Sequence, residues 1–309
     1  MTSTPTRIAY LGPTGTFTEQ ALMSQADLAV GELIPFSKFV DVLDATSSGE
    51  VDLGFVAIEN AIEGTVNVTL DALAFDHQLL IQREVVLDIR MELMATAGTN
   101  PADISTVYSH PVAIAQCREY LHKELPDAEV KAANSTSEAA VMAAKQPGLA
   151  AIGPALSAKA HGLEILASDI ADHPGNKTRF VLVAPSGVPA RSGHDKTTVV
   201  LHQREDKPGS LVAILQEFAA RTINLSRLSS RPVKTALGNY CFIIDLVGHI
   251  ADDVVADCLR SVRAKHAEVK FLGSYPAAGA AASETRDRMT TAFAEAEAWM
   301  TDLRAQIES

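Results

Sequence analysis

Thr178 and Arg179 are the residues of this chain whose types and placement suit chemistry best. They stand where a polar loop, Asp172–Gly175, gives way to an apolar run, Phe180–Val183. A hydroxyl can donate a hydrogen bond and a guanidinium can hold an anion, so the mouth of a buried strand would carry both groups. A Thr-Arg-Phe tripeptide is also ordinary at a strand end, and its significance depends on the polar residues that other segments bring to it.

A second candidate is the turn Gly12–Thr16, which follows a predicted strand at Arg7–Leu11 and opens a helix. Thr16 with Glu19 three residues later is a capping-box signature. A helix N-terminus after a glycine-bearing turn offers backbone N–H groups to an anion. The glycine spacing fits neither dinucleotide nor P-loop fingerprints, so nucleotide binding is not supported, and a purely structural turn is the alternative.

Glu59 and Asn60 form a third candidate, because they follow the apolar strand Asp52–Ile58. Polar groups just beyond the carboxyl end of a strand stand where open α/β sheets bind ligands. Strand and helix patterns alternate from residue 7 to residue 183, which predicts two α/β lobes with parallel sheets. The runs Leu79–Asp88 and Arg90–Ala95 are expected to cross into the second lobe.

The elements after residue 183 predict a different module. Pro, Gly and Ser are frequent between residues 184 and 194, which marks a linker. Strands and helices then follow in the order β-α-β-β-α-β from residue 195 to residue 275, the order of a small ferredoxin-like domain. The apolar spacing from residue 283 to residue 308 predicts a terminal helix that packs on a neighbour or a second chain.

Composition excludes several classes of function. The chain has 309 residues, of which 47% are hydrophobic and 21% are charged, which is typical of a globular protein of about two domains. Its net charge of -12 argues against a nucleic-acid partner. No apolar run reaches the ~18 residues that span a bilayer, and no export signal follows Met1, so a cytoplasmic protein without a membrane partner is expected.

Metal binding is not indicated either. The three cysteines, Cys117, Cys241 and Cys258, are widely spaced and lack a C-x-x-C pair, so we expect them to be small core residues. The nine histidines include no zinc-binding spacing, and no metal site is predicted.

Five motifs together resemble the monofunctional prephenate dehydratases that carry a C-terminal ACT regulatory domain. Each motif is weak alone, but the set occurs in the order of the family and spans most of the chain. The motifs are Gly12-Pro13-x-Gly15-Thr16-Phe17-Thr18-Glu19, Ile58-Glu59-Asn60 with Glu63-Gly64-Thr65-Val66, Ser109-His110-Pro111, Asn176-x-Thr178-Arg179-Phe180 and Ser230-Arg231-Pro232.

The resemblance implies a catalytic region at 1–185 with a periplasmic-binding-type fold, in which the substrate lies between two lobes. We assign about 1–80 and 170–185 to the first lobe and about 81–169 to the second. The reaction implied is the conversion of prephenate to phenylpyruvate, water and CO2 for L-phenylalanine biosynthesis, without a cofactor. The catalytic residues implied by motif matching are Thr178, Glu59, Asn60, Ser109 and Gln116. The residues expected to bind substrate are Arg179, Lys177, Thr14, Gly15, Thr16, Thr65 and Phe180.

The chemistry of that reaction constrains the roles. Hydroxide must leave as water, which requires a proton donor at the departing oxygen. A threonine hydroxyl is too weak an acid to supply the proton, so we expect Thr178 to donate a hydrogen bond while an acid such as Glu59 supplies the proton. Loss of CO2 removes negative charge from the ring carboxylate, so a cation paired with that group would stabilise the starting state more than the transition state. A cation is therefore expected on the pyruvyl carboxylate. Arg179 or Lys177 is expected there, and the alternative is that Arg179 braces Glu59 or Glu63.

The ACT domain at 195–275 implies feedback regulation by L-phenylalanine and assembly into a dimer or tetramer. Gly209 begins a predicted helix whose free N–H groups could receive an amino-acid carboxylate. Ser229 stands where the family usually has Glu, and a dimerisation surface without ligand is the alternative. The regulatory residues expected are Gly209, Ser210, Leu211, Val212, Asn224, Leu225, Ser230, Arg231 and Pro232.

Two other functions remain open from the sequence. Arogenate dehydratase would perform the same chemistry on a substrate that carries an amine in place of the ketone. A non-catalytic amino-acid sensor is the alternative of a different class, since two-lobed clefts and ACT domains both occur as binders. Thr178 together with Glu59 and Asn60 favours an enzyme, because a sensor needs no donor at a departing hydroxyl.

Overall fold

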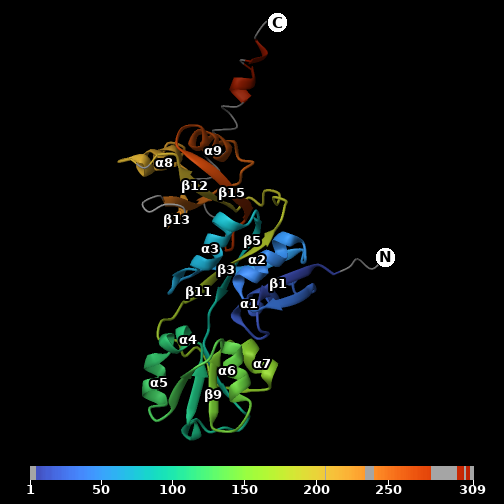
Figure 1. Ribbon diagram of the computed structural model, residues 1–309, viewed down its shortest axis with the longest axis vertical. Coiled ribbons are helices and arrows are strands. Elements are labelled where there is room, and N and C mark those ends of the chain that lie inside the picture. Colours follow the sequence, from blue (N-terminus) through green and yellow to red (C-terminus); the bar gives the residue numbers. More distant parts are fainter. Residues whose placement is uncertain (1–4, 206, 234–239, 280–297, 303, 307–309) are drawn as a thin grey trace. The chain divides into compact units, whose positions relative to one another are not determined.

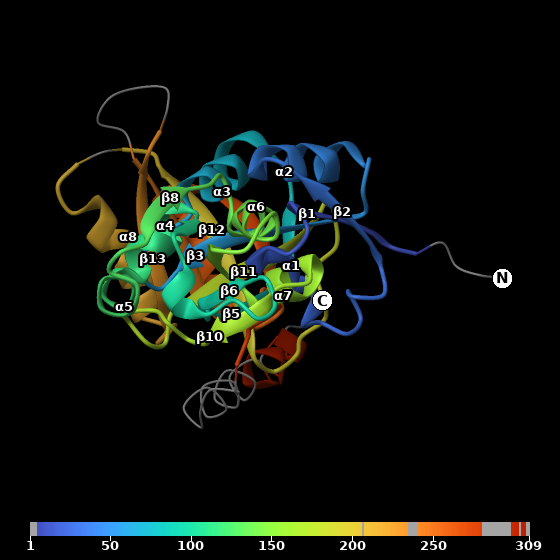
Figure 2. The same cartoon turned by 90° about the horizontal axis from the view of Figure 1, so that it is seen from below.

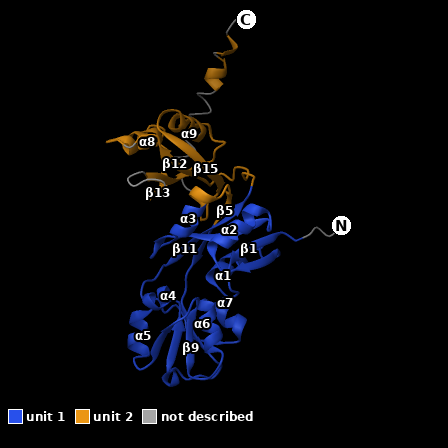
Figure 3. Cartoon of the chain, viewed as in Figure 1, with its two compact units in different colours: residues 1–72, 85–185 blue, residues 73–84, 186–309 orange. Residues whose placement is uncertain are grey.

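Strands and helices alternate through the first 185 residues, and the strands collect into two sheets. The computed structural model describes residues 5–205, 207–233, 240–279, 298–302 and 304–306. Contacts divide the chain into two compact units, residues 1–72 with 85–185 and residues 73–84 with 186–309 (Figure 3). The first unit contains both lobes of the predicted catalytic region.

The first lobe is a sheet of order β2-β1-β3-β11-β5, with a short β4 paired to β3 (Figure 1). Its strands are β1 (Arg7–Leu11), β2 (Glu32–Phe36), β3 (Leu53–Asn60), β4 (Gly64–Thr65), β5 (Leu80–Asp88) and β11 (Lys177–Ala184). Its helices are α1 (Phe17–Met23), α2 (Phe39–Ser48) and α3 (Asn67–Asp71), followed by a π-helix at Ala72–Asp76. The helices α2 and α3 lie beside each other against β3 (Figure 2).

The centre of this sheet is apolar on both faces, which is why β3 and β11 read as continuous hydrophobic runs. Phe55 and Phe180 are fully buried and stack with their ring centroids 5.3 Å apart. Strand β11 runs antiparallel to β3, whereas β1 is parallel to β2 and β3. The predicted parallel sheet is therefore a mixed one, because the chain returns from the second lobe to complete it.

The second lobe is a sheet of order β10-β6-β9-β7-β8, which is also mixed. Its strands are β6 (Glu92–Ala95), β7 (Thr106–Ser109), β8 (Glu129–Ala132), β9 (Leu149–Gly153) and β10 (Glu164–Ala167). Its helices are α4 (Pro111–Gln116), α5 (Arg118–Glu124), α6 (Thr136–Ala143) and α7 (Ala155–His161), with a 3-10 turn at Pro101–Asp103.

The two lobes are joined where β5 passes to β6 and where the chain returns to β11. The N–H of Ile89 donates to the carbonyl of Asn176 at 2.8 Å, so the two connections lie side by side. The expected lobe boundary at residue 81 is wrong by one strand, because β5 belongs to the first sheet and only β6 enters the second. A buried strand and a crossover strand have similar apolar patterns, and the pattern alone did not separate them.

The second unit contains the predicted ferredoxin-like module. Its sheet has the order β13-β14-β12-β15, and all of its strand pairs are antiparallel. The elements are β12 (Asp195–Gln203), α8 (Ser210–Ala219), β13 (Leu225–Pro232), β14 (Tyr240–Val247), α9 (Asp253–Lys265) and β15 (Ala267–Pro276). The predicted pair of α/β lobes and the β-α-β-β-α-β module that follows them are therefore confirmed.

Residues 73–84 group with this module rather than with the lobe from which they come. The ammonium of Lys270 donates to the carbonyls of Leu73, Ala74 and His77 at 2.8, 3.0 and 2.7 Å. The ammonium of Lys196 donates to both carboxylate oxygens of the nearly buried Glu84, each at 3.0 Å. The segment covers the sheet face opposite α8 and α9, since Val269 and Phe271 on either side of Lys270 pack against the helices.

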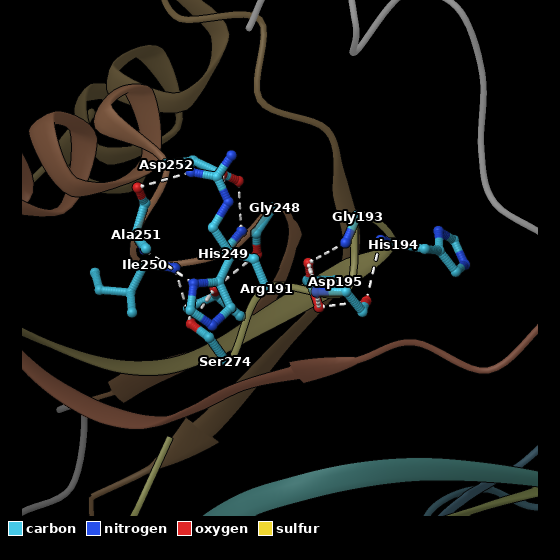
Figure 4. A network of polar contacts seen from close by, with 12 residues as sticks. Arg191, Gly193, His194, Asp195, Gly248, His249, Ile250, Ala251, Asp252 and Ser274 are labelled. Atoms are coloured by element: carbon cyan, nitrogen blue, oxygen red, sulfur yellow. Dashed lines mark hydrogen bonds and ion pairs between the residues drawn. The ribbon is translucent and has the colours of Figure 1, made fainter. Parts of the chain in front are cut away.

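A polar network closes the linker onto the start of the module (Figure 4). The buried carboxylate of Asp195 accepts from the N–H groups of Ser192 and Gly193. The guanidinium of Arg191 lies 3.3 Å from Asp252, which also accepts from the N–H of His249. These contacts satisfy backbone donors at the domain boundary that the Pro- and Gly-rich sequence predicted.

The remaining predictions are answered in part. All three cysteines are buried free thiols, as expected, and burial raises the pKa of Cys117 and of Cys258 to about 12. The predicted helix at 283–308 falls mostly outside the described residues. Residues 298–302, 304 and 305 of this range are described, and they are helical. Within the described part of the chain, no helix combines the length and apolarity needed to span a membrane.

Candidate active site

The pairing of β3 with β11 brings the first candidate residues together. Thr178 lies opposite Asn60 and Arg179 opposite Glu59, although the two segments are more than a hundred residues apart in sequence. The register shifts between Arg179 and Phe180, and such a bulge redirects side chains at the end of a strand. The predicted hydroxyl, carboxylate, amide and guanidinium therefore share one end of the first sheet.

Asn60 is the centre of this group. Its Oδ1 accepts from the backbone N–H groups of Ile62 and Glu63, both at 2.9 Å. Its Nδ2 donates to Thr178 Oγ1 at 2.8 Å and to Asn176 Oδ1 at 3.1 Å. All four hydrogen-bonding positions of the amide are thus engaged.

The hydrogen bonds continue into the second lobe through Gln116, which ends α4. Asn176 Nδ2 donates to Gln116 Oε1 at 3.0 Å, and Gln116 Nε2 lies 3.4 Å from Glu63 Oε1. We call the set Thr178, Asn60, Asn176, Gln116 and Glu63 the amide chain. It contains the predicted residues Thr178, Asn60 and Gln116, and it links residues of both lobes.

Thr178 is 9% exposed, and it accepts a hydrogen bond from Asn60. Among the described residues, no group accepts the proton of its hydroxyl. A hydroxyl whose oxygen is already held by a donor directs its own proton elsewhere. The hydroxyl proton of Thr178 therefore has no acceptor within the described part of the chain.

Arg179 and Glu59 form an ion pair, with 3.4 Å between Arg179 NH1 and Glu59 Oε2. The arginine side chain is 10% exposed and the glutamate side chain 39% exposed. The alternative that the sequence left open, in which Arg179 contacts Glu59, describes this arrangement. Lys177 lies on the solvent side, where its ammonium is 3.2 Å from Asp88.

Ser109, Thr65 and Phe180 are among the predicted residues that lie outside the amide chain. Ser109 is fully buried in the second lobe, and its hydroxyl donates to the carbonyl of Ile152 at 2.7 Å. Thr65 is in β4, paired opposite Glu59. Phe180, for which substrate binding was predicted, lies beyond the bulge, is buried in the core and stacks on Phe55.

The turn between β1 and α1 uses its polar groups internally. Thr16 is the N-cap of α1, where its hydroxyl accepts from the N–H of Glu19 and donates to the carbonyl of Leu11. The N–H of Gly15 donates to the carboxylate of Glu19. The predicted anion contact at this helix start is thus made by the side chain of Glu19, which neutralises the helix terminus locally.

The same turn is also a contact between the lobes. Ser137 donates to the carbonyl of Thr14, and Ser157 donates to the carbonyl of Gly15 at 2.9 Å. Beside this contact is an open cavity of about 720 Å³ with residues of both lobes in its wall. Its wall includes Gly12, Pro13, Thr14, Phe36, Ser135 and His161.

The C-terminal module has a smaller cavity at the start of α8. Gly209 is the N-cap with φ 89°, and no side chain of the described residues caps this helix. The cavity has about 240 Å³ and includes the predicted residues Gly209, Ser210, Leu211, Val212 and Ser230. The predicted Asn224, Leu225, Arg231 and Pro232 are not part of its wall.

Sequence reasoning did not identify Asn176 and Glu63 as site residues, although both belong to the quoted motifs. Asn176 begins the Asn176-x-Thr178-Arg179 motif, and its spacing of two from Thr178 would place both on one face of a strand. Ser137 and Ser157 gave no separate signal, because serines in the first turn of a helix are usually caps.

Comparisons with known proteins identify the family of the chain. The family model "Prephenate dehydratase" matches residues 8–187, and the model "ACT domain" matches residues 197–264. A prephenate dehydratase from Mycolicibacterium vanbaalenii is 44% identical over 283 residues, covering 87% of this chain and 90% of the relative.

Two solved structures are similar along most of the chain. The prephenate dehydratase of Arthrobacter aurescens in complex with L-Phe has a TM-score of 0.85 at 40% identity, covering 97% of this chain and 99% of that one. The enzyme from Staphylococcus aureus has a TM-score of 0.77 at 31% identity, covering 87% of this chain and 99% of that one. The present chain belongs to the prephenate dehydratase family, in the form that carries an ACT domain after the catalytic region.

Proposed function

We propose that this chain converts prephenate to phenylpyruvate, water and CO2 at the end of the first sheet where Thr178 lies. The supporting observation is the hydrogen bond from Asn60 Nδ2 to Thr178 Oγ1, which leaves the hydroxyl proton directed elsewhere. In the proposed reaction the bond from the ring to its carboxylate breaks, and its electron pair completes the aromatic ring. The ring hydroxyl leaves with its own bonding pair and takes up one proton to become water.

Thr178 donates a hydrogen bond to the departing oxygen, and an acid supplies the proton. Glu59 is the acid that we assign, because its carboxylate stands on the residue next to Asn60 and is partly exposed. Stabilisation of negative charge on the departing oxygen is needed only in the transition state, so it raises kcat rather than lowering KM. Arg179 binds the pyruvyl carboxylate in this proposal, and it holds Glu59 in the absence of substrate.

The experiment for the proposed reaction is a turnover assay that follows phenylpyruvate by its absorbance in alkali. Thr178→Val preserves the shape of the side chain and removes the donor, so kcat should fall by on the order of 10²–10⁴-fold. Thr178→Ser restores the hydroxyl and should recover much of the rate. An inactive parent chain, or a valine variant with unchanged kcat, would refute the proposal, and turnover of arogenate alone would indicate the alternative substrate.

The proposal includes feedback regulation by L-phenylalanine at the start of α8. It is supported by the cavity beside Gly209 and by the relative from Arthrobacter aurescens, which was solved in complex with L-Phe. Val212→Asp would place a carboxylate at this cavity, so phenylalanine should bind more weakly by calorimetry. Val130→Asp, at a similarly exposed valine of the second lobe, is the matched control and should bind phenylalanine as the parent does.

Assembly into a homo-oligomer is part of the same proposal. Val212, Leu228 and Tyr240 are 56%, 44% and 47% exposed on the C-terminal module, which suits a surface that a second copy covers. Light scattering on the purified chain would distinguish a monomer from a dimer or tetramer. A cytoplasmic location completes the proposal, and the three free thiols are typical of a reducing compartment.

A further inference from the structure

We infer that Asn176 is a positioning residue that fixes the direction in which the Thr178 hydroxyl donates. This inference deepens the proposed function, on which it rests, and it concerns a residue that the motif comparison had left without a role. Asn176 lies two residues before Thr178 and is 4% exposed. Its side chain contacts Asn60 of the first lobe and Gln116 of the second.

The direction of every hydrogen bond in the amide chain follows from its two ends. At one end, two backbone N–H groups point at Asn60, and because such groups can only donate, they identify that atom as Oδ1. Asn60 must therefore present Nδ2 to both Thr178 and Asn176. At the other end, the carboxylate of Glu63 accepts from Gln116.

Asn176 connects the two ends and has only one orientation that satisfies both neighbours. Its Oδ1 accepts from Asn60, so its Nδ2 must donate to Gln116 Oε1, as observed at 3.0 Å. Gln116 in turn has its Nε2 directed at Glu63. Rotation of any one amide would set two donors or two acceptors against each other.

The consequence for Thr178 is a fixed polarity. Asn60 donates to its oxygen, and an Asn60 amide rotated by a half-turn would instead accept the threonine proton and remove it from the substrate. Asn176 opposes that rotation by accepting the second N–H of Asn60. Because Asn176, Gln116 and Thr178 are all less than a tenth exposed, water does not readily replace a lost partner.

The first test is a double-mutant cycle measured as kcat with prephenate. Asn176→Ala should lower kcat by about tenfold or more and change KM by less than about threefold, because the role concerns the reacting hydroxyl. In a Thr178→Val background the same substitution should have no further effect on kcat, since no hydroxyl remains to be oriented. Two effects that multiply would show that Asn176 acts independently of Thr178 and would overturn the inference.

The second test reverses only the hydrogen bonds from residue 176 to Gln116 and from Gln116 to Glu63, and it remains informative if Asn176→Ala does not fold. With Asn176→Asp the introduced carboxylate still accepts from Asn60, but Gln116 must then rotate to donate to that carboxylate, which turns Gln116 Oε1 toward Glu63. Glu63→Gln supplies a donor at that position. Two acceptors, Gln116 Oε1 and the Glu63 carboxylate, then repel each other and pull residue 176 away from Asn60, which weakens the hold on Asn60. We therefore expect Asn176→Asp to lower kcat and the added Glu63→Gln to recover at least about threefold of it. No recovery in a folded double variant would contradict the inference.

A control and a substrate-independent measurement complete the design. Thr46→Val removes a buried hydroxyl of α2 that donates to the carbonyl of Val42 in the same helix, so it should leave kcat unchanged. In the parent, the side-chain amide protons of Asn60, Asn176 and Gln116 should exchange slowly with water, as measured by NMR. The side-chain amide protons of Asn60 should exchange faster in the Asn176→Ala variant. If the parent chain did not act on prephenate, slow exchange would still support the amide chain, and fast exchange would refute it.

Discussion

Arg179 NH1 lies 3.4 Å from Glu59 Oε2. The two residues are paired across β11 and β3, next to the pair formed by Thr178 and Asn60. The arginine side chain is nearly buried, and the glutamate is the more exposed partner. Removal of the Glu59 carboxylate would leave the nearly buried charge of Arg179 poorly solvated. We therefore expect a substitution of either residue to affect the site.

The kinetics should separate the roles of these two residues. Arg179→Lys keeps the charge but loses the planar fork, so KM for prephenate should rise by about tenfold or more while kcat falls less. Glu59→Gln should instead lower kcat by on the order of 10²-fold with a smaller change in KM. Steady-state assays across pH measure both. A fall in kcat alone for Arg179→Lys would mean that the arginine only positions Glu59.

Gly15→Ala should weaken the contact between the lobes. Gly15 has φ 88°, and a Cβ there would lie 3.1 Å from the hydroxyl oxygens of Ser137 and Ser157. Gly49→Ala is the matched control, because Gly49 has φ 77° with no atom within 4 Å of the added Cβ. Backbone strain alone should cost about 1 kcal/mol at residue 49, and the crowding should add about 1–2 kcal/mol at residue 15. Calorimetric unfolding compares the two variants, and equal losses would contradict the expectation.

Lys270→Met should release residues 73–84 from the C-terminal module. The ammonium of Lys270 satisfies three carbonyls at the π-helix, and burial lowers its pKa. Methionine is of similar length but cannot donate, so the loss should be about 2–3 kcal/mol of local stability. Hydrogen exchange of residues 73–84 measures this. Lys123→Met at an exposed lysine should leave that exchange unchanged.

Glu217 should make the stability of the C-terminal module depend on pH. The pKa of Glu217 is lowered to about 2 by hydrogen bonds from four side chains. The bond from Arg221 contributes most and that from Ser261 next, followed by those from Lys265 and His266. The ordinary glutamate pKa is about 4.3, so the stabilisation is fully present above about pH 4.3 and is lost as the pH falls through about 2.

The comparison with Glu217→Gln isolates this contribution. The parent should be more stable than the variant at pH 7 by on the order of 1–2 kcal/mol, allowing for solvent screening. The difference should shrink between pH 4 and pH 2 in urea unfolding of both proteins. A difference that stayed constant over this range would refute the proposed linkage.

The sequence by itself determined the fold class and predicted which segments could carry chemistry. Apolar runs of strand length, helix-start signals such as Thr16 and Ser135, and the Pro- and Gly-rich linker are local features, and each has a local physical cause. The order of motifs also identified the family before any contact was known. Thr178, Asn60 and Gln116 were named on that basis, and all three occur in the amide chain.

The tertiary structure alone decided the partners of these residues. The antiparallel return of β11 placed Thr178 opposite Asn60, and the bulge after Arg179 turned Phe180 into the core. Such pairings depend on register between distant strands, which a local pattern does not specify. Contacts between distant segments also place residues 73–84 with the C-terminal module. They likewise place Asn176 between Asn60 of the first lobe and Gln116 of the second.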